Sequence, residues 1–365
     1  MVVTTDSIQS NVPLKPYTTF KIGGPARFFT EASTPEQFRR AFAFAREQRL
    51  PIFILGGGSN ILVSDDGFDG LVVHPVRSGF EVEDRGDSTF SACIQAGEMW
   101  DQAVEKSVER ELWGIENLSH IPGQAGAALV QNIGAYGQQV SDVFESADVM
   151  ELNTGVVRTL GPSDCRLGYR TSIFNSDARG KYLILSLRLR LSAYGQPNLT
   201  YPDVREYFRR LGVGTPGLAE IRRAIITIRD RKFPFPREER GGNVGSFFKN
   251  LQLRPMEFEA LRARLAREFA PSVLERLQEI RQRSLSDLIK IPSAFLIDIC
   301  GLKGFRIGGA EVHPGQPLVL MNCGHATARD VLALARHVQQ TVYSRTGMTL
   351  ALEPQLVGFS EENPN

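Results

Sequence analysis

The sequence predicts an α+β protein, because short apolar runs that are typical of strands alternate with capped amphipathic helices. The clearest strand is Leu183–Leu191, in which leucine alternates with serine or arginine as expected for a half-buried strand. The clearest helix start is Thr34, because Pro35 and Gln37 follow it in the pattern of a capping box. This mixture of strands and helices indicates a fold class but says nothing about chemistry.

The N-terminal part, up to about Val76, is predicted to form a small βαβ-like unit. After the helix that begins at Thr34, Pro51–Leu55 and Leu71–Val73 are apolar enough to be buried strands. A second region begins near Phe80. Its expected elements are, in order, a strand at Ser91–Ala96, a helix at Trp100–Arg110, and strands at Asp148–Leu152 and Val156–Leu160.

A third region begins at Tyr207–Thr215, which is predicted to be rich in turns. The sequence shows no internal repeat, so a repeat architecture is not expected. The remaining expected elements are, in order, a helix at Leu218–Lys232, charged helices within Pro255–Arg283, a strand at Leu318–Met321, a capped helix at Thr327–Arg345 with Asp330 at position N3, and a strand at Thr349–Leu352.

Composition excludes several classes of protein. The 365 residues suffice for two or three domains. The 42 basic and 41 acidic side chains nearly cancel, so we expect no partnership with nucleic acid or an anionic membrane. The longest charge-free stretch, residues 117–141, is too rich in Gly, Asn and Gln to span a membrane. Residues 1–11 lack the basic and apolar segments of a signal peptide.

The cysteines and histidines are scattered along the chain and form no CxxC or HxxxH pair. This pattern indicates a reduced, cytoplasmic protein with neither a disulfide framework nor a zinc site. These residues are Cys93, Cys165, Cys300, Cys323, His74, His120, His313, His325 and His337.

Two glycine-rich stretches are candidates for contact with a phosphorylated, aromatic ligand. Leu55–Asn60 follows a buried strand, and its three glycines would let backbone N–H groups approach a phosphate. Its spacing fits neither the dinucleotide-binding nor the P-loop pattern, so a plain turn is the simpler interpretation. Ile121–Gly137 carries four glycines and no charge, and so small and polar a stretch is expected to pack poorly as core. We therefore favour a ligand wall over a long surface loop.

Three polar residues stand out in other motifs. Arg170 is flanked by aromatic and apolar residues, and a partly desolvated guanidinium suits a carboxylate, although a surface ion pair is the simpler alternative. Ser246 lies within Gly241–Asn250 without a nearby histidine, which does not support a hydrolase but leaves a proton donor or a bystander possible. Glu353 ends an apolar run before Pro354, where a surface carboxylate is the alternative.

Taken together and in order, these motifs resemble the UDP-N-acetylenolpyruvoylglucosamine reductase family over essentially the whole chain. Several ordered blocks are a stronger signal than any single motif. The blocks that carry the resemblance are Leu14–Gly24, Leu55–Asn60, Ile121–Gly137, Gly168–Phe174, Gly245–Asn250 and Leu352–Pro354.

The resemblance implies an α+β fold: two FAD-binding subdomains of the vanillyl-alcohol-oxidase type and a C-terminal α+β substrate domain. We expect the subdomains at residues 1–76 and 77–210, the substrate domain at 211–350, and a final strand and tail carrying Glu353 at 351–365.

The resemblance also implies an activity. The family reduces the enolpyruvyl ether of UDP-N-acetylglucosamine to UDP-N-acetylmuramate in peptidoglycan precursor synthesis, with NADPH as reductant and FAD as bound cofactor. The partners would then be NADPH and the UDP-sugar, in a cytoplasmic monomer without metal. The alternatives are a related FAD oxidoreductase with another substrate and a catalytically silent nucleotide-sugar binding module.

Site residues follow from the same resemblance. Arg170, Ser246 and Glu353 would be catalytic, and Tyr201, Lys232 and Asn250 would bind the substrate, with Tyr201 on the loop of the longer subclass. The expected cofactor contacts are Leu55, Gly56, Gly57, Gly58, Ser59, Asn60, Pro122, Gly123, Gly126, Gln131, Asn132, Gly134, Ala135, Tyr136 and Gly137.

Two features depart from the expected pattern. Ile299 stands where the family pattern has glutamine, which puts one polar substrate contact in doubt. The helical segment Pro255–Arg283 is longer than expected, and we interpret it as a surface elaboration without a role in the chemistry.

Overall fold

The computed structural model describes residues 8–232, 241–284 and 287–359. The chain divides into two compact units, each built from segments that are not consecutive in the sequence. Unit 1 comprises residues 1–12, 25–58 and 68–235, and unit 2 comprises residues 13–24, 59–67 and 236–365. We expect no signal peptide in residues 1–11. Residues 1–7 of this stretch lie outside the described residues.

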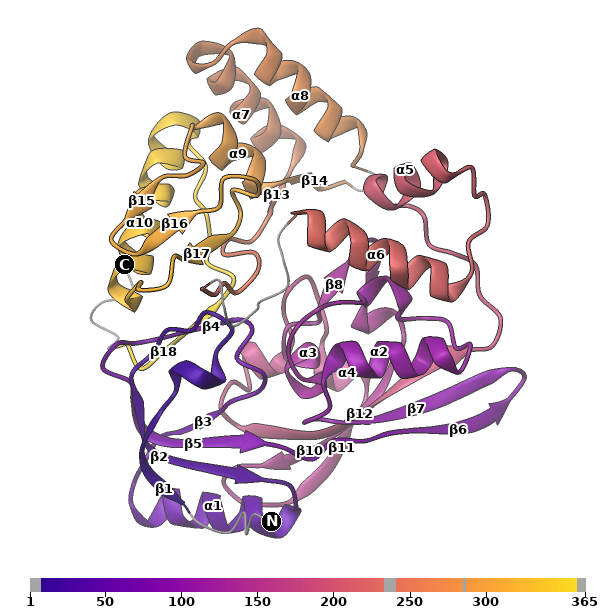
Figure 1. The fold of residues 1–365 in the computed structure, drawn as a ribbon, viewed down its shortest axis with the longest axis vertical. Coiled ribbons are helices and arrows are strands. Elements are labelled where there is room, and N and C mark those ends of the chain that lie inside the picture. The colour runs from indigo at the N-terminus through magenta and orange to yellow at the C-terminus, as the bar shows by residue number, and fades with distance from the viewer. Residues whose placement is uncertain (1–7, 233–240, 285–286, 360–365) are drawn as a thin grey trace. The chain divides into compact units, whose positions relative to one another are not determined.

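The first sheet of unit 1 confirms the expected βαβ-like unit. Its strand order is β1 (Gln9–Pro13), β2 (Pro25–Ala32), β5 (Phe68–Pro75) and β3 (Ile52–Ile54). Strands β2 and β3 both run parallel to β5. Helix α1 (Pro35–Glu47) lies along one face, and Thr34 and Gln37 form the predicted capping box at its start (Figure 1). Phe38 and Phe42 of α1 pack into a core with Leu71 and Val73 of β5.

The second sheet of unit 1 is antiparallel, and β12 (Tyr182–Ser192) is near its middle, which confirms the strand expected at Leu183–Leu191. Leu187 of β12 pairs with Ile94 on one side and Ala147 on the other. Strands β6 (Phe80–Gly86) and β7 (Thr89–Gln95) form a long hairpin at one edge of the sheet (Figure 1). The strand order is β11 (Val157–Leu160), β10 (Phe144–Glu151), β12, β7 and β6.

Among the helices of unit 1, α3 (Ala125–Val130) and α4 (Pro162–Cys165) contact this second sheet. The predicted helix at Leu218–Lys232 forms with those bounds as α6. The remaining elements of unit 1 are α2 (Trp100–Glu109), η2 (Glu116–Leu118), β8 (Gly134–Ala135), β9 (Gln138–Gln139), η3 (Val140–Asp142), η4 (Ile173–Asn175) and α5 (Pro202–Leu211).

Two predictions for unit 1 are wrong. The first half of Tyr207–Thr215 is helical, because Pro202 begins α5 and its Val204 and Phe208, one turn apart, are buried. The turn starts only at Gly212, which adopts the left-handed conformation. The stretch Ile121–Gly137 is not poor core material either. Its helix α3 buries Ala125, Ala128 and Leu129, since small residues let it pack closely.

Unit 2 has one large core between small sheets and helices. The core joins Phe20, Leu62, Phe247 and Phe248, which are distant in sequence, to the apolar face of α10 (Ala328–Thr346). Thr327 and Asp330 form the predicted capping box of α10. The other elements are η1 (Lys15–Tyr17), β4 (Ile61–Val63), β13 (Leu251–Leu253), α7 (Pro255–Glu268), α8 (Pro271–Gln282), β14 (Ile289–Ile291), α9 (Ser293–Ile299), β15 (Arg306–Ile307), β16 (Ala310–Val312), β17 (Leu320–Asn322) and β18 (Gln355–Val357).

The final strand of unit 2 lies later than predicted. Thr349–Leu352 forms no strand; only Leu352 makes an isolated bridge, to Phe248. The strand β18 begins directly after Pro354 and pairs in parallel with β4. A proline directly before the first residue of a strand removes no hydrogen bond from the sheet. Pro354 therefore precedes a strand instead of ending one.

The segment Pro255–Arg283 is part of the core of unit 2, so its interpretation as a surface elaboration is wrong. Helices α7 and α8 contact each other, and Phe258, Leu261, Leu265 and Leu277 are fully buried in the unit 2 core. The charged residues that dominate the sequence of this segment form the solvated face, which conceals the apolar one.

We therefore expect Phe258→Ala to lower the free energy of unfolding by about 3–5 kcal/mol, because it leaves a cavity in the core. Met256→Ala, two residues earlier and at an 85% exposed position, should change it by less than about 0.5 kcal/mol. Urea titration followed by circular dichroism measures both. Equal effects of the two substitutions would show that α7 does not belong to the core.

Candidate functional site

The two predicted glycine-rich stretches touch each other in unit 1. A Cβ atom on Gly57 would lie 2.6 Å from Cα of Gly123, and a Cβ atom on Gly56 would lie 2.9 Å from Cβ of Ala127. Only glycine permits so close an approach of two backbones. His74 holds the start of Leu55–Asn60, because its Nδ1 lies 2.7 Å from the carbonyl oxygen of Leu55.

This junction fits the phosphate groups of a dinucleotide such as FAD. The amides of Gly56 and Gly57 donate no hydrogen bond within the described part of the chain. Both residues are half-buried. Neighbouring backbone amides without side chains form the concave anion sites that bind phosphate. Ser59 and Asn60 belong to unit 2, so only part of the Leu55–Asn60 motif contributes to this junction.

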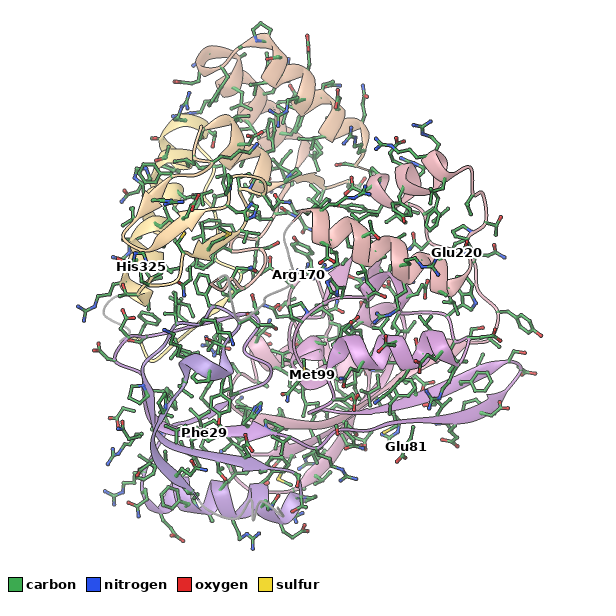
Figure 2. The ribbon with its side chains drawn as sticks, in the orientation of Figure 1. Phe29, Glu81, Met99, Arg170, Glu220 and His325 are labelled. Carbon is green, nitrogen blue, oxygen red and sulfur yellow. The ribbon has the colours of Figure 1, made fainter. Side chains whose placement is uncertain are left out.

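The rest of Ile121–Gly137 is tied to the loop that carries Arg170, which is labelled in Figure 2. Asn132 donates from Nδ2 to the carbonyl oxygen of Gly168 at 2.9 Å, and its Oδ1 accepts from the Ser141 amide. Its side-chain amide is therefore engaged within the protein. The guanidinium of Arg170 donates to the carbonyl oxygen of Gly134 at 2.8 Å. These bonds fix the guanidinium beside β8.

The backbone of Arg170 is strained. Its φ of 54° lies in the left-handed region, which costs a non-glycine residue about 1 kcal/mol or more. A short turn imposes this conformation, because Gly168 and Thr171 bridge each other and the Asn175 side chain donates to the carbonyl oxygen of Arg170. Such strain is concentrated at functional sites, which agrees with a side chain held in one orientation for a ligand.

The structure brings Tyr136, Tyr201 and Lys232 together, as a cluster that we call the aromatic–lysine cluster. The two rings meet edge to face with centroids 5.1 Å apart. The Lys232 ammonium lies 5.9 Å from the Tyr136 ring and 5.6 Å from the Tyr201 ring, and it forms an ion pair with Asp203. Burial opposes the charged form of Lys232, but Tyr201 and Asp203 outweigh it and raise its pKa. Lys232 is therefore cationic at neutral pH and suited to a phosphate.

Arg229 adds a second positive charge behind Tyr136. Its Nε is buried, burial lowers the pKa of its guanidinium, and it hydrogen-bonds to Tyr136. Burial raises the pKa of the Tyr136 phenol, which therefore stays protonated. Sequence analysis missed Arg229 and Asp203. Arg229 lies one turn after the buried Ile225, so the helical repeat of α6 could have identified it as a buried cation.

Helix α6 is anchored to α2 by ion pairs. Met99 and Glu220, labelled in Figure 2, mark the starts of these helices. Arg222 of α6 binds both carboxylate oxygens of Asp101, at 2.6 and 3.1 Å. The Arg222 side chain is only 11% exposed, so solvent screens the pair weakly. This bidentate contact holds the helix whose last residue is Lys232.

In unit 2 the structure places Ser246 and Glu353 on adjacent extended segments. Ser246 bridges Val319, and the Glu353 amide donates to the carbonyl oxygen of Phe247 at 2.9 Å. Asn60 donates from Nδ2 to the carbonyl oxygen of Glu353 at 3.1 Å. Three residues predicted from separate motifs therefore lie side by side. Arg170, the third predicted catalytic residue, belongs to unit 1.

Asn250 lies beside the start of α9, and Ile299 is the last residue of that helix. The Oδ1 atom of Asn250 accepts from the Ser293 amide at 3.1 Å at the start of α9, which leaves its Nδ2 group to donate. Ile299 at the other end of α9 is half-buried and packs against the unit 2 core. The residue that replaces the expected glutamine therefore contributes apolar packing.

The remaining titratable groups offer little further chemistry. Within residues 8–232, 241–284 and 287–359, no group of three His, Cys, Asp or Glu side chains could hold a metal ion. The same residues contain no helix that is long and apolar enough to cross a membrane. All four cysteines are free thiols, and burial raises the pKa of Cys165 to about 12 and that of Cys300 to about 11. Neither buried thiol is a nucleophile at neutral pH.

The Asp101–Arg222 pair predicts a pH dependence of stability. Burial alone would raise the pKa of Asp101, but its hydrogen bonds to Arg222 and the His120 amide lower it overall. Because the folded-state pKa is depressed, the stabilisation is present above about pH 4 and is lost as pH falls through the folded-state value.

We expect Asp101→Asn to destabilise the protein by about 1.5–3 kcal/mol at neutral pH, and the difference from the unsubstituted protein to shrink below about pH 4. Asp69→Asn, at an 86% exposed carboxylate, is the matched control and should have little effect. Thermal unfolding followed at several pH values measures both. A difference that does not vary with pH contradicts the assignment.

Comparison with known proteins identifies matches over both units. Residues 26–161 match the family model described as FAD binding domain. Residues 236–357 match the model described as UDP-N-acetylenolpyruvoylglucosamine reductase, C-terminal domain. The two models thus cover the glycine-rich junction and the Ser246–Glu353 segments respectively.

Relatives of similar length match nearly the whole chain. The UDP-N-acetylenolpyruvoylglucosamine reductase of Pseudomonas aeruginosa is 40% identical over 350 residues, which are 96% of this chain and 98% of the relative. That of Neisseria gonorrhoeae is 39% identical over 349 residues, 95% and 96% of the two chains. The crystal structure of the reductase from Thermus caldophilus has a TM-score of 0.64 at 25% identity and covers 96% of this chain and 99% of that one. The chain therefore belongs to the UDP-N-acetylenolpyruvoylglucosamine reductase family.

Proposed function

We propose that Arg170, Ser246 and Glu353 carry out catalysis in this family member. The reaction itself follows from membership. The chain is an FAD-dependent oxidoreductase that reduces the enolpyruvyl ether of UDP-N-acetylglucosamine to UDP-N-acetylmuramate with NADPH, in peptidoglycan synthesis. The observation that supports this most is the 40% identity to a reductase over 96% of the chain.

FAD, when bound, carries hydride from NADPH to the enolpyruvyl group. The chain's own residues must then bind the substrate carboxylate, where negative charge builds up, and supply a proton. Arg170 suits the first task because its guanidinium is planar, can donate two parallel hydrogen bonds to a carboxylate and is held by Gly134. A positioned donor of this kind contributes about 3–4 kcal/mol to stabilising such charge.

Ser246 would donate the proton that completes the lactyl ether. A serine hydroxyl is a weak acid, so it must be held in one place relative to the substrate. The hydrogen bonds on either side of its segment provide this, because Phe247 donates to Leu318 and accepts from Glu353. Glu353, on the next segment, would assist at the substrate carboxylate. This requires its carboxyl group to be protonated, since two carboxylates would repel each other.

We further propose that the aromatic–lysine cluster and Asn250 bind the UDP part of the substrate. Lys232 supplies positive charge for the diphosphate, and Tyr201 is exposed enough to contact it. The junction of the two glycine-rich stretches would hold FAD, with the fifteen residues expected from sequence as its contacts. The subdomain boundaries at 76, 210 and 350, a cytoplasmic location and a monomeric state without nucleic-acid partners remain proposals.

Ser246→Ala should leave reduction of the bound flavin by NADPH nearly unchanged and lower turnover of the sugar nucleotide at least about 100-fold, because only the second half-reaction needs the proton. Stopped-flow absorbance separates the two half-reactions. Arg170→Ala should likewise impair only the second. An equal loss in both half-reactions contradicts the proton-donor and carboxylate roles.

Gly57→Val should abolish flavin binding, because a side chain cannot fit against Gly123. Gly214→Ala, at a position where a Cβ atom meets nothing within 4 Å, is the control and should retain flavin. Flavin absorbance per mole of folded protein is the measurement, with circular dichroism to confirm folding. A folded Gly57→Val protein with full flavin content would show that the junction does not hold the cofactor.

A further inference from the structure

We propose that Asn117 is a positioning residue that holds the segment from Tyr194 to Tyr201, the 194–201 segment, against the β8–β9 hairpin, and so fixes Tyr201 in the aromatic–lysine cluster. The inference rests on the proposed role of this cluster in binding the UDP part of the substrate. Sequence analysis assigned no role to Asn117. All of the residues concerned belong to unit 1.

Asn117 joins two parts of unit 1 with one side chain. It is fully buried, and its Nδ2 donates to the carbonyl oxygen of Tyr136 at 2.7 Å and to that of Asn198 at 2.9 Å. The first carbonyl belongs to the turn of the β8–β9 hairpin and the second to the 194–201 segment. A neutral group with two donors on one nitrogen is available only from Asn and Gln, so few residues could replace it.

The other end of the Asn117 side chain supports this interpretation. Its Oδ1 is buried and has no hydrogen-bond partner among the described residues. An unpaired buried oxygen is unfavourable, so packing alone would favour an apolar side chain of similar size. The two carbonyl contacts offset this cost. The side chain is therefore best explained by the two segments that it connects.

Further contacts draw the same two segments together. Asn198 donates from Nδ2 to the carbonyl oxygen of Gly137 at 2.9 Å. Within the 194–201 segment, the Thr200 hydroxyl donates to Asn198 Oδ1 at 2.6 Å and so orients the Asn198 side chain. A Cβ atom on Gly137 would lie 2.6 Å from Oγ1 of Thr200, so the segment approaches a residue that must be glycine. Gly137 also has a φ of +88°, which disfavours other residues.

Asn117 is itself held in place from the hairpin side. Its backbone amide donates to Gln138 Oε1 at 2.8 Å, and Gln138 Nε2 donates to Oε1 of the buried Glu116 at 2.6 Å. Glu116 Oε2 accepts from the Gly114 amide at 2.8 Å. This chain of hydrogen bonds orients Asn117 before any ligand binds.

Loss of the Asn117 hydrogen bonds would affect the surroundings of Lys232, because Tyr201 lies beside it. Tyr201 ends the 194–201 segment and is the N-cap of α5, and its ring packs edge to face on Tyr136. Without Asn117, the Tyr136 carbonyl and the 194–201 segment lose their shared donor. Tyr201 would then sample other positions, and the binding site for the UDP part would be formed only some of the time.

Trp113 provides a signal that is independent of activity. A Cβ atom on Gly195 would lie 2.4 Å from Cγ of Trp113, so the 194–201 segment lies directly on the indole ring. The sequence contains only one other tryptophan, Trp100, which is fully buried and donates from Nε1 to the Leu118 carbonyl. A change in tryptophan fluorescence that disappears in Trp113→Phe therefore reports on the segment.

The test uses the flavin-loaded full chain with Asn117→Leu, which keeps the size of the side chain and removes both donors. We expect faster hydrogen exchange at residues 194–201, a Trp113-dependent fluorescence change, and a KM for the sugar nucleotide raised about tenfold or more with a smaller change in kcat. Flavin reduction by NADPH should be unchanged. Asn198→Ala should produce the same effects, because it removes the Asn198–Gly137 hydrogen bond between the same two segments. The double variant should show little further increase in hydrogen exchange or KM.

Asn322→Leu is the matched control for hydrogen exchange, because Asn322 is a buried asparagine of unit 2 that donates to the Phe20 carbonyl. It should leave exchange at residues 194–201 unchanged. If Asn117→Leu also leaves that exchange unchanged, the inference is overturned. If exchange rises while KM stays the same, Asn117 does position the segment, and it is the proposed substrate role of Tyr201 that fails.

Discussion

The contact between the backbones of Gly57 and Gly123 is the constraint on which the site of unit 1 depends. A side chain on Gly57 would separate the two glycine-rich stretches, and the backbone of Gly56 and Gly57 would no longer lie beside Ile121–Gly137. The later residues of Ile121–Gly137 connect this junction to the rest of the site. Asn132 joins this stretch to the Arg170 loop by a hydrogen bond, and Tyr136 belongs to the aromatic–lysine cluster.

Backbone hydrogen bonds play the corresponding part in unit 2. The segment around Ser246 lies between Leu318–Val319 and the stretch that ends at Glu353, and it is bonded to both. Neither Ser246 nor Glu353 has to be placed by its own side chain. In unit 2, therefore, main-chain hydrogen bonds set the positions of both residues, which agrees with sites built on rigid supporting contacts.

The sequence predicted elements well where a local signal decides them. The caps at Thr34 and Thr327 marked helix starts because the capping side chain and its partner are three residues apart. It failed where packing decides. Helix α5 was hidden within an apparent turn region, and the apolar face of α7 and α8 was masked by its charged neighbours. Burial depends on residues far along the chain, which local patterns do not contain.

The same distinction applies to the site. The glycine-rich motifs, Ser246 and Glu353 could be predicted as candidate site residues because they stand in recognisable blocks with a family resemblance. Arg229, Asp203 and Asn117 act through contacts with residues distant in sequence, and no block marks them. Their roles became visible only when hydrogen bonds and burial were known. Ile299, by contrast, was noticed as a departure, and its packing in the unit 2 core shows what replaced the expected polar contact.

An anaerobic titration of the purified chain tests the assigned function most directly. The bound flavin should lose its visible absorbance when NADPH is added and regain it on addition of about one equivalent of UDP-N-acetylenolpyruvoylglucosamine, with UDP-N-acetylmuramate as product. Absorbance that returns only when oxygen is admitted, or a folded protein that holds no flavin, would contradict the account.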